Sequence, residues 1–291
     1  MTADGAAALS VIQTAQLRSG DVLLMRARGS LASLIAWFNE SSYSHVALLG
    51  RAGYLIEIAA GGVVELALAQ RLIDPNVLAM DARRLLNLSA DTQVNDRIAV
   101  LAHALSLRRP TSAGDALAAL GRAVALRDRR LPPSAQLRAV LREGLHHAAF
   151  DTANAMSASE FVYRCFAENT AQPRGRLAPS LAIAPPSLQP FPSLDWEELW
   201  REISPCLRPA RREALRLDEH GQPGSAQEVS EEEFAAALTD TRQRLGLMER
   251  GNAFLSVAGP RLPNPKCVRL RDLESSPSFA QLGSLLGGPA I

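Results

Sequence analysis

The sequence predicts an α+β fold, built as a single domain that spans residues 1–291. Between Leu17 and about Leu68, short β-type runs and one helical run are separated by turns that contain glycine. After Asp91 the chain changes to segments rich in alanine, leucine and arginine, which favour helix. A hydrophobic fraction of 47% is enough to form one substantial core.

The helical run in the first region begins near Ser30. Serine is a favourable N-cap residue, because its hydroxyl can accept a hydrogen bond from a backbone amide of the first turn. Apolar residues then recur at helical spacing, at Leu31, Leu34, Ile35 and Phe38. We therefore expect one face of this helix to be buried.

Two insertions are expected within the domain. Residues 91–150 form a helical insertion, broken at Arg109-Pro110 and at Leu131-Pro132-Pro133. Residues 176–252 form a second insertion, in which the proline-rich run Leu177–Pro192 excludes regular helix or central strand and predicts a loop or lid.

The end of the second insertion is polar and then helical. An acidic stretch, Asp218–Glu233, leads into a helix that ends at about Arg250. Two later runs, Ala253–Val257 and Lys266–Leu270, are expected to return to the sheet.

Composition excludes several classes of partner. The net charge is +1 and the arginines are spread among nearly as many acids, which is not typical of a nucleic-acid-binding surface. No apolar run is long enough to span a membrane, and no secretory signal is recognisable, so we expect a cytoplasmic protein or export by a specialised system. Contact with a membrane surface and the oligomeric state stay open. The spacing of the cysteines and histidines predicts neither a disulfide framework nor a metal site, and we expect no cofactor.

A histidine and a glutamate stand on two strands that a short turn joins. These strands are expected at 43–49 and 54–58. A three-residue loop, Gly50 to Ala52, places His45 directly opposite Glu57, with Cβ atoms about 5 Å apart. An even-numbered loop would place the two side chains on opposite faces of the sheet. These strands alone favour an ordinary cross-strand polar pair on a solvated face, but a carboxylate beside an imidazole also fits a catalytic triad.

A later helix start supports the catalytic interpretation. Ser157 and Glu160 form an S-x-x-E capping box, which predicts a short helix to about Glu168 with Ala158 as its first residue. A cysteine at this position would have its thiolate stabilised by the helix dipole and by a nearby imidazolium. Alanine is also simply a good helix former.

These motifs, taken together and in this order, resemble the circularly permuted NlpC-type family of papain-like cysteine hydrolases. The resemblance rests on Gly20–Leu24, Tyr43–Leu48, Ile56-Glu57, Gly62–Val64, Ser159–Val162, and the closing residues Val268–Leu273 and Ser276–Ser278. The same motifs are also similar to those of the relatives of lecithin:retinol acyltransferase. The resemblance implies a circularly permuted papain-like fold, in which an antiparallel sheet packs on the nucleophile helix and helical insertions are added.

The family's nucleophilic cysteine aligns with Ala158. The resemblance implies that His45 acts as base and then acid, and that Glu57 orients His45. Tyr43 precedes His45 by two residues and shares its face of the strand, so its hydroxyl can touch substrate, although a packed aromatic is the commoner case. We interpret the alanine as an engineered replacement in preference to a natural one, because the other site residues remain in place. Cys165 is expected to be a buried hydrophobe, and Ser159 to face outward.

The predicted function is a thiol hydrolase or acyltransferase that acts on an amide or acyl ester of a peptide or lipid, and that is inactive in this chain. The proline-rich apolar run Leu177–Pro192 and the glycine- and leucine-rich tail Leu282–Ile291 favour an acyl-lipid substrate slightly, and buried packing explains both equally well. The alternative is a natural, non-catalytic binding module that keeps the papain-like groove. A purely structural α+β domain is the third class.

Overall fold

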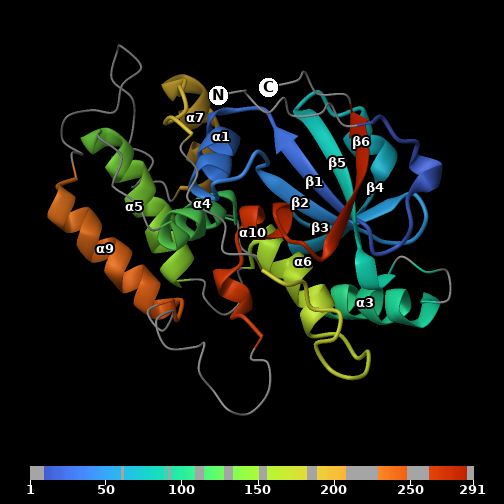
Figure 1. Cartoon of the computed structure of the whole chain (residues 1–291). Coiled ribbons are helices and arrows are strands. Elements are labelled where there is room, and N and C mark those ends of the chain that lie inside the picture. The colour runs from blue at the N-terminus through green and yellow to red at the C-terminus, as the bar shows by residue number, and fades with distance from the viewer. Residues whose placement is uncertain are drawn as a thin grey trace, which may run out of the picture.

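A computed structural model describes residues 10–59, 62–88, 90, 93–108, 115–127, 134–150, 156–181, 189–207, 229–247 and 262–286. One six-stranded antiparallel sheet has the strand order β4-β3-β2-β1-β5-β6 (Figure 1). Its strands are β1 (Val22–Ala27), β2 (His45–Leu49), β3 (Tyr54–Ala59), β4 (Gly62–Ala67), β5 (Val77–Leu85) and β6 (Phe279–Leu286).

Some helices pack on this sheet, and others form a second, helical half of the molecule with its own core. The α-helices are α1 (Ser30–Phe38), α2 (Leu68–Leu72), α3 (Val94–Ser106), α4 (Asp115–Leu126), α5 (Ala135–Phe150), α6 (Ala158–Ala167), α7 (Trp196–Ile203), α9 (Glu231–Arg244) and α10 (Leu270–Glu274). Short 3₁₀ turns occupy η1 (Thr14–Gln16), η2 (Leu86–Leu88), η3 (Ser204–Cys206) and η6 (Pro265–Cys267). The prediction of an α+β fold is confirmed.

The two faces of the sheet bury different residues, because side chains alternate along each strand. Val46 and Leu48 of β2 face α6, where they join a core with Phe161. Ala47 and Leu49 belong to a separate apolar cluster on the other face. α6 therefore packs on one face of the sheet, and α3 packs on α6 in turn.

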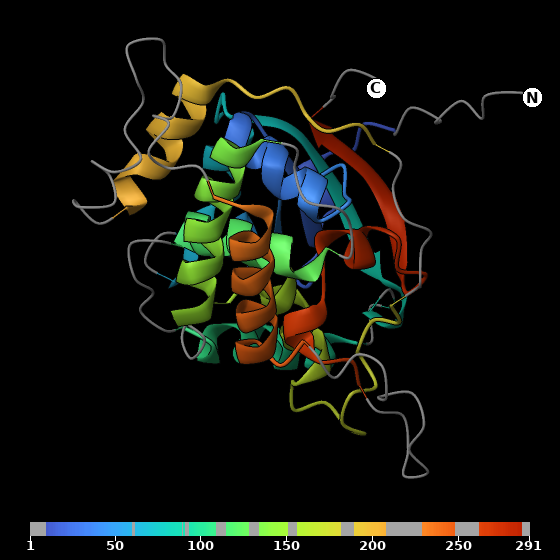
Figure 2. The ribbon, with the colours of Figure 1, turned by 90° about the vertical axis from the view of Figure 1, so that its left-hand side faces the viewer.

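The helical half has its own core, formed mainly by α1, α4, α5, α7 and α9. Figure 2 shows α5 and α9 running side by side, with α4 beside them. α4 and α5 approach closely where Gly121 meets Gly144, since a Cβ added at Gly121 would lie 1.9 Å from the Gly144 carbonyl oxygen. Only glycine permits so close a contact between helix backbones.

The first helix forms as predicted, with a different cap. Leu31, Leu34 and Phe38 are buried, while Ile35 is only partly buried. The N-cap is Gly29, with φ 113°, and Ser30 is already helical. The Ser30 hydroxyl donates to Glu198 of α7 at 2.8 Å, so serine joins two helices here.

The C-terminal strand is not where the sequence predicted it. Lys266–Leu270 does not return to the sheet, because it forms the 3₁₀ turn η6 and leads into α10. The returning strand is β6, which was not predicted and which includes the first residues of the tail Leu282–Ile291, for which a lipid-directed role and buried packing were equally expected. Its partner β5 was not predicted either. The other expected run, Ala253–Val257, lies outside the described residues.

The predicted helical insertions are partly described. Residues 91–150 contain α3, α4 and α5, and the expected breaks at Arg109-Pro110 and Leu131-Pro132-Pro133 lie outside the described residues. The helix expected to end near Arg250 is α9. The described parts of Leu177–Pro192 contain neither helix nor strand, as predicted. Among the described helices, none combines the length and apolar composition needed to cross a bilayer.

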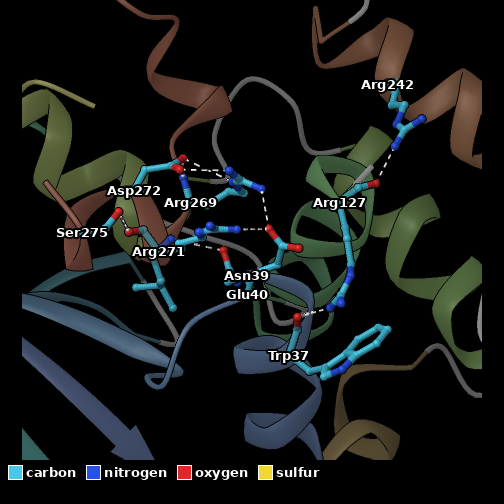
Figure 3. Close-up of polar contacts among 10 residues, drawn as sticks. Trp37, Asn39, Glu40, Arg127, Arg242, Arg269, Arg271, Asp272 and Ser275 are labelled. Atoms are coloured by element: carbon cyan, nitrogen blue, oxygen red, sulfur yellow. Dashed lines mark hydrogen bonds and ion pairs between the residues drawn. The ribbon is translucent and has the colours of Figure 1, made fainter. Parts of the chain in front are cut away.

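A buried charge network joins the chain's closing segment to the end of α1 (Figure 3). Arg269 and Arg271 both donate to Glu40, which follows α1. Arg269 also pairs with Asp272 at 3.0 Å. Nearby, the Arg127 guanidinium stacks over the Trp37 ring and donates to its carbonyl oxygen. The network fixes α1 against both α10 and α4.

Candidate active site

The register of β2 and β3 brings His45 and Glu57 to the same face of the sheet. Leu48 pairs with Ile56 and Leu49 with Leu55, so the three-residue loop is Arg51–Gly53, one position later than expected. The shift moves Glu57 from directly opposite His45 to a diagonal position, but the loop stays odd-numbered, so both side chains remain on one face.

His45 and Glu57 lie close together at the end of the strand pair. The ladder between β2 and β3 stops before His45, so the two strands separate there. His45 Nε2 lies 3.3 Å from Glu57 Oε2, at ion-pair distance but without the alignment of a hydrogen bond. The His45 side chain is 27% exposed and that of Glu57 is fully buried. Catalytic hydrogen bonds often tighten only when substrate is bound.

Glu57 has a second charged partner, Arg71 of α2, which was not predicted. The Arg71 guanidinium donates to Glu57 Oε1, and it also pairs with Asp74 at 3.2 Å. Burial alone would raise the pKa of Glu57, but its interactions with His45 and Arg71 outweigh burial and lower it. Glu57 is therefore held ionised beside the imidazole.

A pocket of about 230 Å³ lies where β2 and β3 separate. His45, Ile58 and Ala59 line it from the sheet, and the residues from Met156 to Ser159 line it from the start of α6. Ile35 of α1, Asn39 just after it, and residues of α4 form a further wall. The structure thus brings His45 and Ala158 to one pocket.

The start of α6 is fixed by four contacts. Ser157 caps the helix, as predicted, because its hydroxyl accepts a hydrogen bond from Glu160 N at 3.1 Å. The carboxylate of Glu160 does not complete the capping box and instead pairs with Arg122 of α4 at 2.7 Å. Ser159 is buried, not outward-facing, because its hydroxyl donates to Val268 O at 2.8 Å and it touches Ser157 Oγ at 3.2 Å.

A second pocket, of about 380 Å³, adjoins the first on the Arg71 side. Met25 and Ala27 of β1, Leu31 and Ala32 of α1, and Arg71 line it. Both pockets share Ser44, His45, Ile58 and Ala59. His45 therefore stands on the border between the side of the sheet that α6 covers and the side that holds Glu57.

Tyr43 and Cys165 point elsewhere. The Tyr43 hydroxyl donates to Asp81, and neither of the two pockets counts Tyr43 among its lining residues. Burial, and then the nearby Asp81, raise the pKa of Tyr43. Cys165 is fully buried, and burial raises the pKa of its thiol, so this thiol is poorly suited to replace a nucleophile at position 158.

Two residues of the site, Arg71 and Arg122, were not predicted from the sequence. Arg71 follows β4, the partner of β3, so the strand order could have placed it near Glu57. Arg122 lies in an alanine-rich helix, and nothing in the sequence connects it with Glu160. Within the described ranges, no three histidine, cysteine or acidic side chains gather as metal ligands.

The chain has no match among models of known protein families, and none among the curated proteins. The class is therefore defined by the fold alone: a mixed α+β protein with a six-stranded antiparallel sheet.

Proposed function

We propose that the fold is a circularly permuted papain-like fold and that the site is that of a thiol hydrolase or acyltransferase whose nucleophile position holds Ala158. The observation that carries the proposal is the pocket in which His45, paired with Glu57, and the capped start of α6 meet. Together they would supply the base, its orienting acid and the place for a nucleophile.

In the proposed reaction, a thiolate at position 158 attacks the substrate carbonyl carbon and forms a tetrahedral intermediate. The intermediate collapses to a thioester when the leaving amine or alcohol takes a proton from the His45 imidazolium. His45 then removes a proton from water, or from an acceptor alcohol, which attacks the thioester and releases the thiolate. Because Nε2 of His45 faces Glu57, the mechanism assigns proton transfer to Nδ1.

The start of α6 would stabilise charge at two stages. The first intrahelical hydrogen bond of α6 runs from Phe161 N to Ser157 O. The backbone amide of Ala158 precedes it, at the positive end of the helix dipole. This amide is suited to donate to the oxyanion of the intermediate, and the same dipole would favour a thiolate over a thiol.

The alternative function is a natural binding module that uses the same pocket without catalysis. One observation favours it, namely that position 158 holds a methyl group with no nucleophilic atom. In this case the pocket would bind an amide or acyl-ester ligand and release it unchanged.

Replacing Ala158 by cysteine separates the two functions. The variant Ala158→Cys should react with iodoacetamide at pH 7 faster than a free cysteine, and His45→Ala in this background should slow the reaction. Phospholipids and cell-wall peptides, assayed side by side, should show turnover of one class. Peptide mapping by mass spectrometry distinguishes position 158 from the buried Cys165, which serves as an internal control.

The proposal of a hydrolase would be overturned if the thiol at position 158 reacts like a free cysteine, if its rate does not depend on His45, and if neither substrate class is turned over. The binding module would then be the better account. The natural gene's codon at position 158 offers an independent check, because a cysteine codon would exclude the binding module.

A further inference from the structure

One wall of the pocket beside Ala158 belongs to α4, within the insertion expected at 91–150. Ala116, Ala119 and Ala123 line the pocket, and their spacing places them on a single face of the helix. Other side chains of α4, among them Leu117 and Leu120, pack into the core of the helical half. α4 therefore lines the pocket with three alanine methyl groups, together with Leu126 and Arg122, while its other large side chains hold it in the helical half.

The position of this wall relative to the reacting atom is closely fixed. The ion pair between Arg122 and Glu160 joins α4 to the first turn of α6, where Ala158 lies. Behind it, the contact between Gly121 and Gly144 holds α4 directly against α5. A wall held from both sides cannot easily retreat from a bulky ligand.

The chemistry of the wall is apolar despite the arginine. The Arg122 guanidinium is paired with the Glu160 carboxylate at 2.7 Å, and both side chains are almost fully buried. The pair needs no anion from the ligand, because its charges offset each other. Besides this arginine, α4 lines the pocket with three alanine methyl groups and with Leu126, and these side chains are all apolar.

We propose that α4 is the specificity wall of this site and that it accepts a narrow, unbranched apolar substituent next to the reacting carbonyl. The inference rests on the proposed function for the reacting atom, but the width of the pocket is a separate property that can be measured separately. It also gives the helical insertion a role, as the part of the chain that selects the substrate.

The experiment uses the full chain with Ala158→Cys and two alkylating probes, iodoacetamide and its N-butyl derivative. The measured quantity is the ratio of their second-order rates at position 158. Adding Ala119→Leu should lower the N-butyl rate relative to iodoacetamide by about tenfold or more, since a single methylene in a fitted pocket changes discrimination by roughly 10–200-fold.

The matched control is Ala32→Leu, the same change in the adjoining pocket, which shares His45 but does not include position 158. It should leave the ratio within about twofold, a small effect beside the range expected for a fitted pocket. Ala116→Leu, at an exposed position of α4, should act in the same direction as Ala119→Leu and guards against misfolding of the latter.

The outcomes remain distinguishable. An unchanged ratio in both α4 variants, or an equal change in Ala32→Leu, would overturn the specificity wall even if the thiol is highly reactive. A thiol at position 158 that reacts no faster than a free cysteine would overturn the proposed catalysis, yet the ratio of the two probes would still report whether α4 limits the pocket.

Discussion

The sheet side and the helical side of the pocket are built on different principles. On the sheet side, the ionisable groups His45, Glu57 and Arg71 are close in sequence and are joined by a hairpin and a short helix. On the helical side, α4 presents three alanines and a leucine, and a buried ion pair from Arg122 reaches Glu160, far along the chain.

This difference suggests a division of labour. A hairpin fixes the relative position of its own residues through register, so chemistry that needs precise distances is well placed there. Helices packed from distant segments can change side chains on one face without disturbing the reactive pair. Substitutions on the two sides should therefore have separable effects on stability and reactivity.

The largest expected effect on stability comes from the buried ion pair on the helical side. Arg122→Met should lower the free energy of unfolding by about 3–5 kcal/mol, because it leaves the Glu160 carboxylate buried without this partner. Urea-induced unfolding measures the change. The control is Arg164→Met, whose 33% exposed side chain lies 3.7 Å from Glu160 and should contribute at most about 1 kcal/mol. Equal losses in both variants would contradict the prediction.

A smaller effect is expected where α4 and α5 cross. Gly121→Ala should destabilise the protein by about 1–3 kcal/mol, because its Cβ would overlap the Gly144 carbonyl group. Gly144→Ala is the graded comparison: its Cβ would lie 3.1 Å from Leu117 O, so the helices need to shift only slightly. Thermal unfolding measures the destabilisation of each variant. A larger destabilisation by Gly144→Ala than by Gly121→Ala would show that α4 and α5 are not in such close contact at Gly121.

The smallest effect should appear on the sheet side, as a dependence on pH. The pKa of Glu57 is lowered below its ordinary value of 4.5, so the ionised carboxylate adds stability above pH 4.5, which is lost as pH falls through the lowered pKa. Glu57→Gln should remove this contribution. The difference in unfolding free energy between the parent and the variant, measured from pH 7 to pH 3, should be constant at first and shrink on acidification. A difference that grows towards low pH would show that the carboxylate is not the favoured form.

Local patterns predicted most of what lies close together in sequence. The α1 helix, the hairpin that carries His45 and Glu57, and the Ser157 cap all depend on neighbours within a few residues, and the structure contains each of them. The prediction that His45 and Glu57 share one face of the sheet depended only on an odd number of loop residues. The loop lies one residue later than expected but is still odd-numbered, so the two side chains became diagonal neighbours on the same face.

Distant pairings were not predictable in the same way. β6 pairs with β5 across about two thirds of the chain, since Phe279 lies opposite Leu85, and a single sequence carries no signal for such a partner. Ser159 seemed exposed because its helix was considered alone, whereas its hydroxyl bonds to the closing segment at Val268. Glu160 fits a capping box by its spacing, but a buried arginine from α4 competes successfully for its carboxylate.

The strand β6 also has a consequence for how the chain acquires its structure. Leu85 pairs with Phe279, so β5 lacks its outer neighbour until almost all of the described chain has been synthesised. During translation β5 would be an unpaired edge, and such edges can join other chains. Pairings between such remote segments also form slowly. The sheet is therefore expected to be completed late, once β6 is available to pair, and newly made protein would be vulnerable to aggregation until β6 is in place.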